Sequence, residues 1–120
     1  MKKILIIDDE EYFCRVLKKS LESGSNFHVL TATRGKDGIW LAKTQKPDLI
    51  LLDVMMPDMA GSDVAEILSE SPITASIPII FVTAIVKQKE VNQSGGIMGG
   101  QRFIAKPIVI DELVEKIKAI

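Results

Sequence analysis

The segment DLILLDVMMP, residues 48–57, decides the fold of this 120-residue chain. Its aliphatic run from Leu49 to Leu52 does not alternate with polar residues, which is typical of a strand buried on both faces in a parallel sheet. The strand ends at Asp53, and ligands of open α/β sheets bind beyond the carboxyl ends of the strands. We therefore expect Asp53 to lie at a functional site.

Further apolar segments predict four more strands, at residues 4–7, 28–33, 77–82 and 102–105. Between the strands, apolar residues recur at spacings of three and four, which indicates amphipathic helices. The clearest are the helix that closes near residue 24, the helix that runs from residue 38 to Lys46 and stops at Pro47, the helix that follows Gly61 and the last helix of the chain. Residues 85–94 have only a weak helical pattern. Alternating strands and helices predict an α/β fold, a doubly wound parallel sheet with helices on both faces, in one domain of residues 1–120.

Composition and charge limit the possible functions and locations of the protein. The chain has 15 basic and 16 acidic residues and a formal net charge of -1, which does not favour binding to nucleic acid. The single cysteine, Cys14, cannot form an internal disulfide, which fits a reducing compartment. The amino terminus lacks the pattern of a signal peptide, and no segment is long and apolar enough to span a membrane. We expect a cytoplasmic protein.

Polar residues follow directly on several of the predicted strands. Asp8 and Asp9 follow the first strand, Asp53 ends the third, Thr83 follows the fourth and Lys106 follows the fifth. Because parallel strands end at one edge of a sheet, we expect these five side chains to lie together. Three carboxylates so close repel one another unless a cation compensates them, and Mg²⁺ prefers oxygen ligands of this kind.

These residues together favour phosphoryl chemistry. Lys106 supplies a compact positive charge and Thr83 a hydroxyl donor, so the edge forms a cradle for a phosphoryl group. A carboxylate such as Asp53 can act as a nucleophile and form an acyl phosphate. In-line transfer then requires positioning and charge neutralisation rather than a general base.

Four segments, residues 4–10, 48–57, 82–84 and 103–107, resemble the receiver domain of two-component response regulators, and the resemblance covers essentially the whole chain. It implies a flavodoxin-like sheet of five parallel strands in the order 2-1-3-4-5. It also implies a signalling switch that takes a phosphoryl group from a sensor histidine kinase or a phosphotransfer protein. Such a module catalyses only its own phosphorylation and slow dephosphorylation, and it acts on an effector protein or an output domain outside this chain.

The resemblance also assigns roles at the acidic edge. Asp53 is similar to the phosphoacceptor, which also contacts the metal. Asp9 is similar to a direct ligand of Mg²⁺, and Asp8 to an acid that holds the ion partly through water. The backbone carbonyl of Met55 corresponds to the third protein ligand. Lys106 corresponds to the lysine that pairs with the phosphoryl group.

Other residues resemble the switch and structural positions of the family. Thr83 is similar to the hydroxyl that moves onto a phosphoryl oxygen, and Phe103 to the aromatic residue that swings inward with it. Pro107 resembles the proline that follows the lysine, whose peptide bond is usually cis. Gly61 resembles the glycine that opens the third helix.

The sequence departs from the family pattern at several positions. Ala60 stands where a small polar residue is common. Residues 95–101 read GGIMGGQ, without the acids that support dimerisation in many DNA-binding members, so the oligomeric state stays open. Met55 and Ile85 are apolar at two positions that influence attack of water on the acyl phosphate. We expect a moderately long-lived phosphorylated state.

Three other functions are weaker alternatives. A Mg²⁺-dependent phosphohydrolase with an aspartyl nucleophile normally has an acid two residues after it, and Met55 occupies that position. A flavin-binding domain of the same fold needs a phosphate loop rich in Ser, Thr and Gly, but residues 8–11 are all acidic. A degenerate receiver that only binds partners would not need the intact set of acids, threonine and lysine. We also expect Cys14 and Trp40 to pack and His28 to be structural.

Overall fold

The computed structural model describes residues 1–24, 26–84, 97–98 and 101–120. The strands in chain order are β1 (Lys2–Ile7), β2 (Phe27–Ala32), β3 (Leu49–Asp53), β4 (Ile79–Thr83), β5 (Ile97–Met98) and β6 (Gln101–Ala105). The helices are α1 (Glu11–Gly24), α2 (Gly35–Gln45), α3 (Gly61–Ser69) and α5 (Ile110–Lys118). Some of the sequence features discussed above fall outside these described residues. They are the weak helical pattern of residues 85–94 and the departures from the family pattern at Ile85, residues 95–96 and residues 99–100.

The strands form one sheet in the order β2-β1-β3-β4-β6-β5. Strands β2, β1, β3, β4 and β6 pair in parallel, which confirms the predicted five-stranded parallel sheet and its order. The two-residue strand β5 adds an antiparallel pairing at the β6 edge that the sequence pattern did not predict. All five parallel strands point their carboxyl ends to the same edge, where the candidate site lies.

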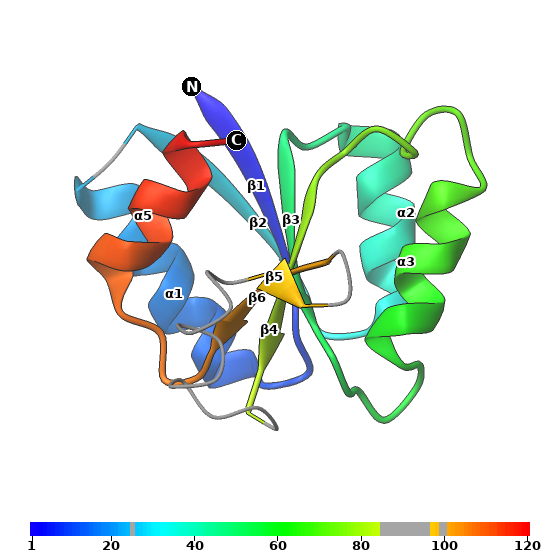
Figure 1. The fold of residues 1–120 in the computed structure, drawn as a ribbon, viewed down its shortest axis with the longest axis horizontal. Helices are drawn as coiled ribbons and strands as arrows, with labels where there is room; N and C mark the ends of the chain where they lie inside the picture. Colours follow the sequence, from blue (N-terminus) through cyan, green and yellow to red (C-terminus); the bar gives the residue numbers. More distant parts are fainter. Residues whose placement is uncertain (25, 85–96, 99–100) are drawn as a thin grey trace.

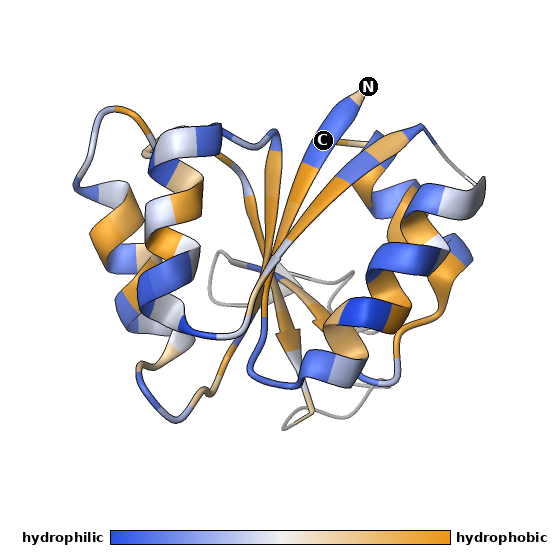
Figure 2. Ribbon diagram, turned by 180° about the vertical axis from the view of Figure 1, so that it is seen from behind, coloured by the Kyte–Doolittle hydropathy of each residue, from blue (hydrophilic) through white to orange (hydrophobic). Residues whose placement is uncertain are grey.

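Helices cover both faces of the sheet, with α1 and α5 on one side and α2 and α3 on the other (Figure 1). The middle parts of the central strands are apolar (Figure 2). Because successive side chains of a strand point to opposite faces, each strand supplies both layers of the core. In β3, for example, Leu49 and Leu51 pack in the layer of α1 and α5, and Ile50 and Leu52 pack in the layer of α2 and α3.

Local signals explain where the helices begin and end. Helix α2 stops where Lys46 adopts the left-handed conformation, with φ 48°, and the predicted stop at Pro47 follows. The amino end of α2 is capped from another loop, because Asp58 accepts hydrogen bonds from the amides of Gly35 and Lys36. Helix α3 ends at Ser69, earlier than the sequence pattern suggested.

The predicted packing can be compared with the structure at Cys14 and Trp40. Cys14 is buried, as predicted, and burial, followed by the charge of Asp8, raises the pKa of its thiol to about 12. Trp40 was expected to pack, but 63% of it is exposed on α2, so this prediction was wrong. Helical spacing alone did not show that this position faces outward. Among the described helices, none is long and apolar enough to cross a membrane.

Candidate functional site

The acids predicted from the strand ends come together at the carboxyl edge of the sheet. Asp8, Asp9 and Asp53 each offer a carboxylate oxygen, and these oxygens lie within 4.8 Å of one another. Asp8 and Asp53 are buried, with 8% of Asp53 exposed, whereas Asp9 is exposed. The cluster is therefore open to solvent on one side and closed by the strand ends on the other.

Asp8 is held in place by several contacts. Its amide donates to the carbonyl oxygen of Ala32 on the neighbouring strand, at 3.0 Å. Its Oδ1 accepts a hydrogen bond of 2.9 Å from the amide of Glu10, and its carbonyl oxygen accepts one of 3.3 Å from Cys14 Sγ. These bonds fix the turn between β1 and α1. Helix α1 begins at Glu11, directly after this turn.

Lys106 follows β6 directly and brings its ammonium to the same edge. Nζ lies 2.9 Å from Asp8 Oδ2 and 2.7 Å from Glu10 Oε1. It also lies 4.3 Å from the centroid of the Phe13 ring, a cation–π distance. The contact with Asp8 is an ion pair without hydrogen-bond geometry, so the buried Oδ2 atom has no hydrogen bond.

The electrostatics of the cluster favour a bound cation. Burial, the negative charge of Asp8 and the contact with Asp9 together raise the pKa of Asp53 to about 7, against the opposing effect of Lys106. Burial also raises the pKa of Asp8. For Lys106, burial alone would lower the pKa, but the contacts with Glu10 and Asp8 more than compensate and raise it. One lysine therefore does not neutralise the acids that surround it.

The donor set fits a divalent cation such as Mg²⁺. The oxygens of three carboxylates lie within 4.8 Å of one another, and Asp8 Oδ2 is buried without a hydrogen bond. Met55 belongs to the loop directly after β3, and its side chain is exposed. Hydrogen bonds fix both sides of this loop, because the Val54 amide donates to Val82 at 3.2 Å and the Gly61 amide to Val54 at 2.8 Å.

The remaining predicted residues lie on β4 and β6, directly after β6 and at the start of α3. Thr83 ends β4 and is buried, and its carbonyl oxygen accepts a hydrogen bond of 2.9 Å from the Lys106 amide. Phe103 lies on β6 and stacks on Phe81, with ring centroids 5.2 Å apart. The peptide bond between Lys106 and Pro107 is cis, as the resemblance implied. Gly61 opens α3, also as implied.

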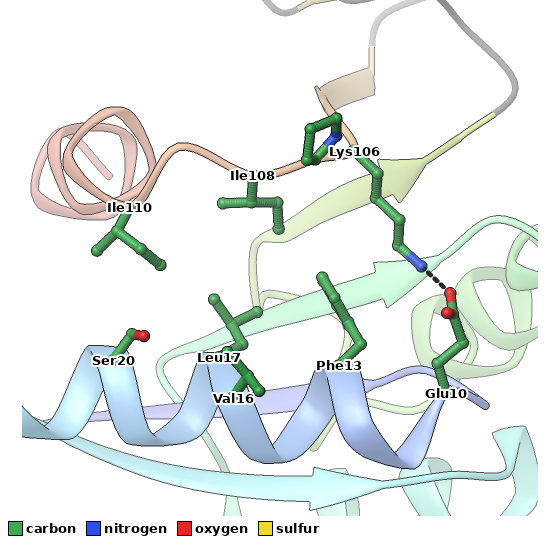
Figure 3. A pocket seen from close by; sticks show the side chains of 9 residues that line it. Glu10, Phe13, Val16, Leu17, Ser20, Lys106, Ile108 and Ile110 are labelled. Atoms are coloured by element: carbon green, nitrogen blue, oxygen red, sulfur yellow. Dashed lines mark hydrogen bonds and ion pairs between the residues drawn. The ribbon is translucent and has the colours of Figure 1, made fainter.

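The structure adds contacts that the sequence analysis did not identify. Glu10 and Phe13 contact Lys106 from the start of α1, and they continue into a groove of about 470 Å³ between α1 and the loop before α5 (Figure 3). The other lining residues are mostly apolar: Val16, Leu17, Ser20, Pro107, Ile108 and Ile110. The acidic run of residues 8–11 was the available signal for Glu10, but nothing in it identified Lys106 as its partner.

The fold and the site define a flavodoxin-like protein with an acidic cluster at the carboxyl edge of its sheet. The sequence profile of the response regulator receiver domain matches residues 4–118, and the chain belongs to this family. Receiver domains are signalling modules of two-component systems. They interact with histidine kinases and downstream effectors, and they generally bind Mg²⁺ at an acidic pocket.

Relatives include regulators of different lengths. The chain is 38% identical to the alkaline phosphatase synthesis transcriptional regulatory protein PhoP of Bacillus subtilis, over 99% of this chain and 48% of that protein. It is 35% identical to protein PilH of Pseudomonas aeruginosa, over 100% of this chain and 98% of that protein. It therefore spans about half of the first relative and nearly all of the second.

Solved structures show the same fold. A response regulator from Desulfuromonas acetoxidans superposes with a TM-score of 0.81 at 28% identity, over 99% of this chain and 95% of that chain. The receiver domain of the Francisella response regulator 1452 also gives 0.81, at 26% identity, over 99% of this chain and 95% of that chain.

Proposed function

We propose that this chain is a phosphorylation-dependent switch whose Asp53 accepts a phosphoryl group from a sensor histidine kinase or a phosphotransfer protein. The single observation that best supports the proposal is the clustering of Asp8, Asp9 and Asp53 beside the Lys106 ammonium at the carboxyl edge of the sheet. Residues 1–120 act as one receiver domain. The protein works in the cytoplasm, where two-component kinases present their phosphohistidine.

The proposed reaction is an in-line transfer. A carboxylate oxygen of Asp53 attacks the phosphorus of the phosphohistidine, a P–O bond forms and the P–N bond breaks. The electron pair of that bond stays on the leaving imidazole nitrogen, which takes up a proton from solvent. Mg²⁺, when bound, neutralises the negative charge of the carboxylates and the phosphoryl oxygens. Its proposed ligands are Asp9, Asp53, the carbonyl of Met55 and, partly through water, Asp8.

The residues of the chain itself position the phosphoryl group. Asp8 is fixed by the Ala32 carbonyl and the Glu10 amide, so its carboxylate has a defined place at the edge. Lys106 binds a phosphoryl oxygen through its ammonium. The hydroxyl of Thr83 moves onto another oxygen, and Phe103 moves inward with it. This population shift changes which effector binds the face near Phe103.

The proposed switch turns over slowly. Met55 stands two residues after Asp53, and 66% of this residue is exposed. An apolar side chain there does not orient a water molecule for attack on the acyl phosphate. We therefore propose a moderately long-lived phosphorylated state and no role as a turnover enzyme. The near-neutral net charge of -1 supports a protein effector or an output domain rather than direct contact with nucleic acid.

The proposal is tested by incubation with acetyl phosphate, with and without Mg²⁺, and measurement of the intact mass. One added phosphoryl group that requires Mg²⁺ and disappears in Asp53→Asn is the expected result. The matched control is Asp63→Asn, which replaces an exposed aspartate of α3 and should be phosphorylated like the wild type. A wild type that forms no adduct and binds no Mg²⁺ would show that the acids are structural.

A further inference from the structure

The ammonium of Lys106 lies on the α1 side of the site. Glu10 Oε1 is 2.7 Å from Nζ, and the Phe13 ring lies beneath it with its centroid 4.3 Å away (Figure 3). Within the described part of the chain, the ion pairs of Lys106 at 4.0 Å or less are those with Asp8 and Glu10. No such pair joins Lys106 to Asp53, the proposed acceptor. Of the three contacts that this ammonium makes with described residues, two therefore come from residues at the start of α1.

The two acids that hold Lys106 differ in burial. Asp8 is buried, so a broken ion pair would leave its carboxylate without a counter-charge, which is costly. The side chain of Glu10 is 62% exposed, so water can solvate its carboxylate when the ammonium leaves. A shift of Lys106 toward a phosphoryl group on Asp53 therefore breaks the contact with Glu10 first and can retain the contact with Asp8.

We propose that Glu10 is a positioning residue that holds the Lys106 ammonium away from Asp53 in the unphosphorylated domain and releases it as the phosphoryl group arrives. This inference rests on the proposed function of Asp53. Glu10 competes with the phosphoryl oxygens for the same ammonium. Because its contact exists before transfer and is lost during transfer, it stabilises the resting state and slows phosphorylation.

The test measures the rate of phosphorylation by acetyl phosphate, read by intact mass, in Glu10→Gln and Glu10→Asp. Loss of a partly exposed ion pair should raise the rate about two- to fivefold. Glu10→Asp keeps the negative charge, but its side chain is one methylene shorter and does not reach Nζ. It should therefore accelerate phosphorylation as Glu10→Gln does. The rate in Glu10→Asp therefore distinguishes two explanations, loss of the contact with Lys106 and weaker repulsion of the anionic phosphodonor.

Glu11→Gln is the matched control, because it removes one negative charge from the adjacent residue. Glu11 pairs with Arg15 at 3.3 Å and does not contact Lys106. This variant should be phosphorylated at the wild-type rate. Glu11→Gln should unfold close to the wild-type temperature, whereas the two Glu10 variants should unfold at a slightly lower temperature because they lose the ion pair with Lys106.

The outcomes separate this inference from the proposed function. Unchanged or slower phosphorylation in Glu10→Gln would overturn the role of Glu10 and leave Asp53 as the acceptor. Acceleration in Glu10→Gln with the wild-type rate in Glu10→Asp would also overturn it, because charge alone would then explain the effect. Equal acceleration in Glu11→Gln leads to the same conclusion. A wild type without any adduct on Asp53 would overturn both.

Discussion

Gly61, the first residue of α3, lies directly against the backbone carbonyl oxygen of Asp53. A Cβ atom at Gly61 would overlap this oxygen and would lie 3.1 Å from the Cα of Val54. The amide of Gly61 also donates a hydrogen bond of 2.8 Å to the carbonyl oxygen of Val54. The loop after β3 is therefore folded back onto the end of the strand that carries the proposed acceptor.

Gly61→Ala should therefore disturb both stability and chemistry. The new methyl group meets backbone atoms, which cannot move as a flexible side chain does, so we expect a loss of roughly 1–3 kcal/mol in the free energy of unfolding. The displaced Asp53 should also be phosphorylated more slowly. Urea unfolding and intact mass after acetyl phosphate measure the two effects. Gly24→Ala is the control, because nothing lies within 4 Å of its added Cβ. Equal stability of the two variants would contradict the prediction.

The raised pKa of Asp53 predicts a pH-dependent stability in metal-free solution. Between the ordinary pKa of 3.8 and about 7, the unfolded chain has released the proton that the folded protein retains. The free energy of unfolding should therefore fall as the pH rises through this window. Asp53→Asn removes the ionisable group and with it this pH dependence. The variant should therefore be as stable as the wild type at about pH 4 and more stable than the wild type above about pH 7.

The size of this effect follows from the shift. Each pKa unit corresponds to about 1.4 kcal/mol, so the difference between Asp53→Asn and the wild type should reach a few kcal/mol at most. Urea unfolding in the presence of a chelator, repeated across the pH range, measures it. Asp63→Asn, at an exposed position, is the matched control. If Asp53→Asn stabilised the protein equally at every pH, the stabilisation would not arise from the raised pKa of Asp53, and the prediction would be wrong.

The stacked pair of Phe81 and Phe103 should contribute to the stability of the unphosphorylated domain. The rings lie 5.2 Å apart at an interplanar angle of 25°, in the layer of α2 and α3. Phe103→Leu should therefore lower the free energy of unfolding by about 1 kcal/mol. Phe103→Leu should still be phosphorylated by acetyl phosphate in a reaction that requires Mg²⁺, because Phe103 is not one of the acids of the cluster. Phe13→Leu is the contrasting variant, because it removes the ring beneath Lys106 and leaves the stacked pair intact.

Met55→Asn should shorten the life of the phosphorylated protein. The residue is exposed, so the fold should tolerate the change, and an amide can orient a water molecule where the thioether does not. The measurement is loss of the phosphoryl mass after the donor is removed. Met55→Leu, which stays apolar, should keep the wild-type lifetime. An unchanged lifetime in Met55→Asn would refute the proposed effect of this position.

Much of the architecture follows from local sequence. Continuous apolar runs such as residues 49–52 predicted buried parallel strands, and the residues just after them predicted the acidic edge. The structure brings Asp8, Asp9 and Asp53 together because parallel strands share one carboxyl edge. These predictions succeeded because they depend only on strand direction and on continuous apolar runs in the sequence.

Other features depend on contacts between residues far apart in the chain. The pairing of Glu10 with Lys106 joins residues separated by 96 positions, and no local pattern encodes it. The capping of α2 by Asp58 is likewise a contact between two loops. The short strand β5 depends on pairing with β6 rather than on a period of its own. Sequence periodicity also failed for Trp40, because α2 mixes apolar and polar residues around its circumference.

Because side chains alternate along the strands, neighbouring residues of one strand lie on opposite faces of the sheet. Ile104 packs with α1 and α5, and two residues further on Lys106 reaches the acids at that side, whereas Phe103 packs with α2 and α3. The sheet thus separates the Lys106 ammonium and the acids that it contacts from the Phe103 ring, which lies on the opposite face. Substitutions on the two faces should therefore have nearly additive effects on the stability of the unphosphorylated domain. In the proposed switch, the joint movement of Thr83 and Phe103 is then the link between phosphorylation on one face of the sheet and effector binding on the other.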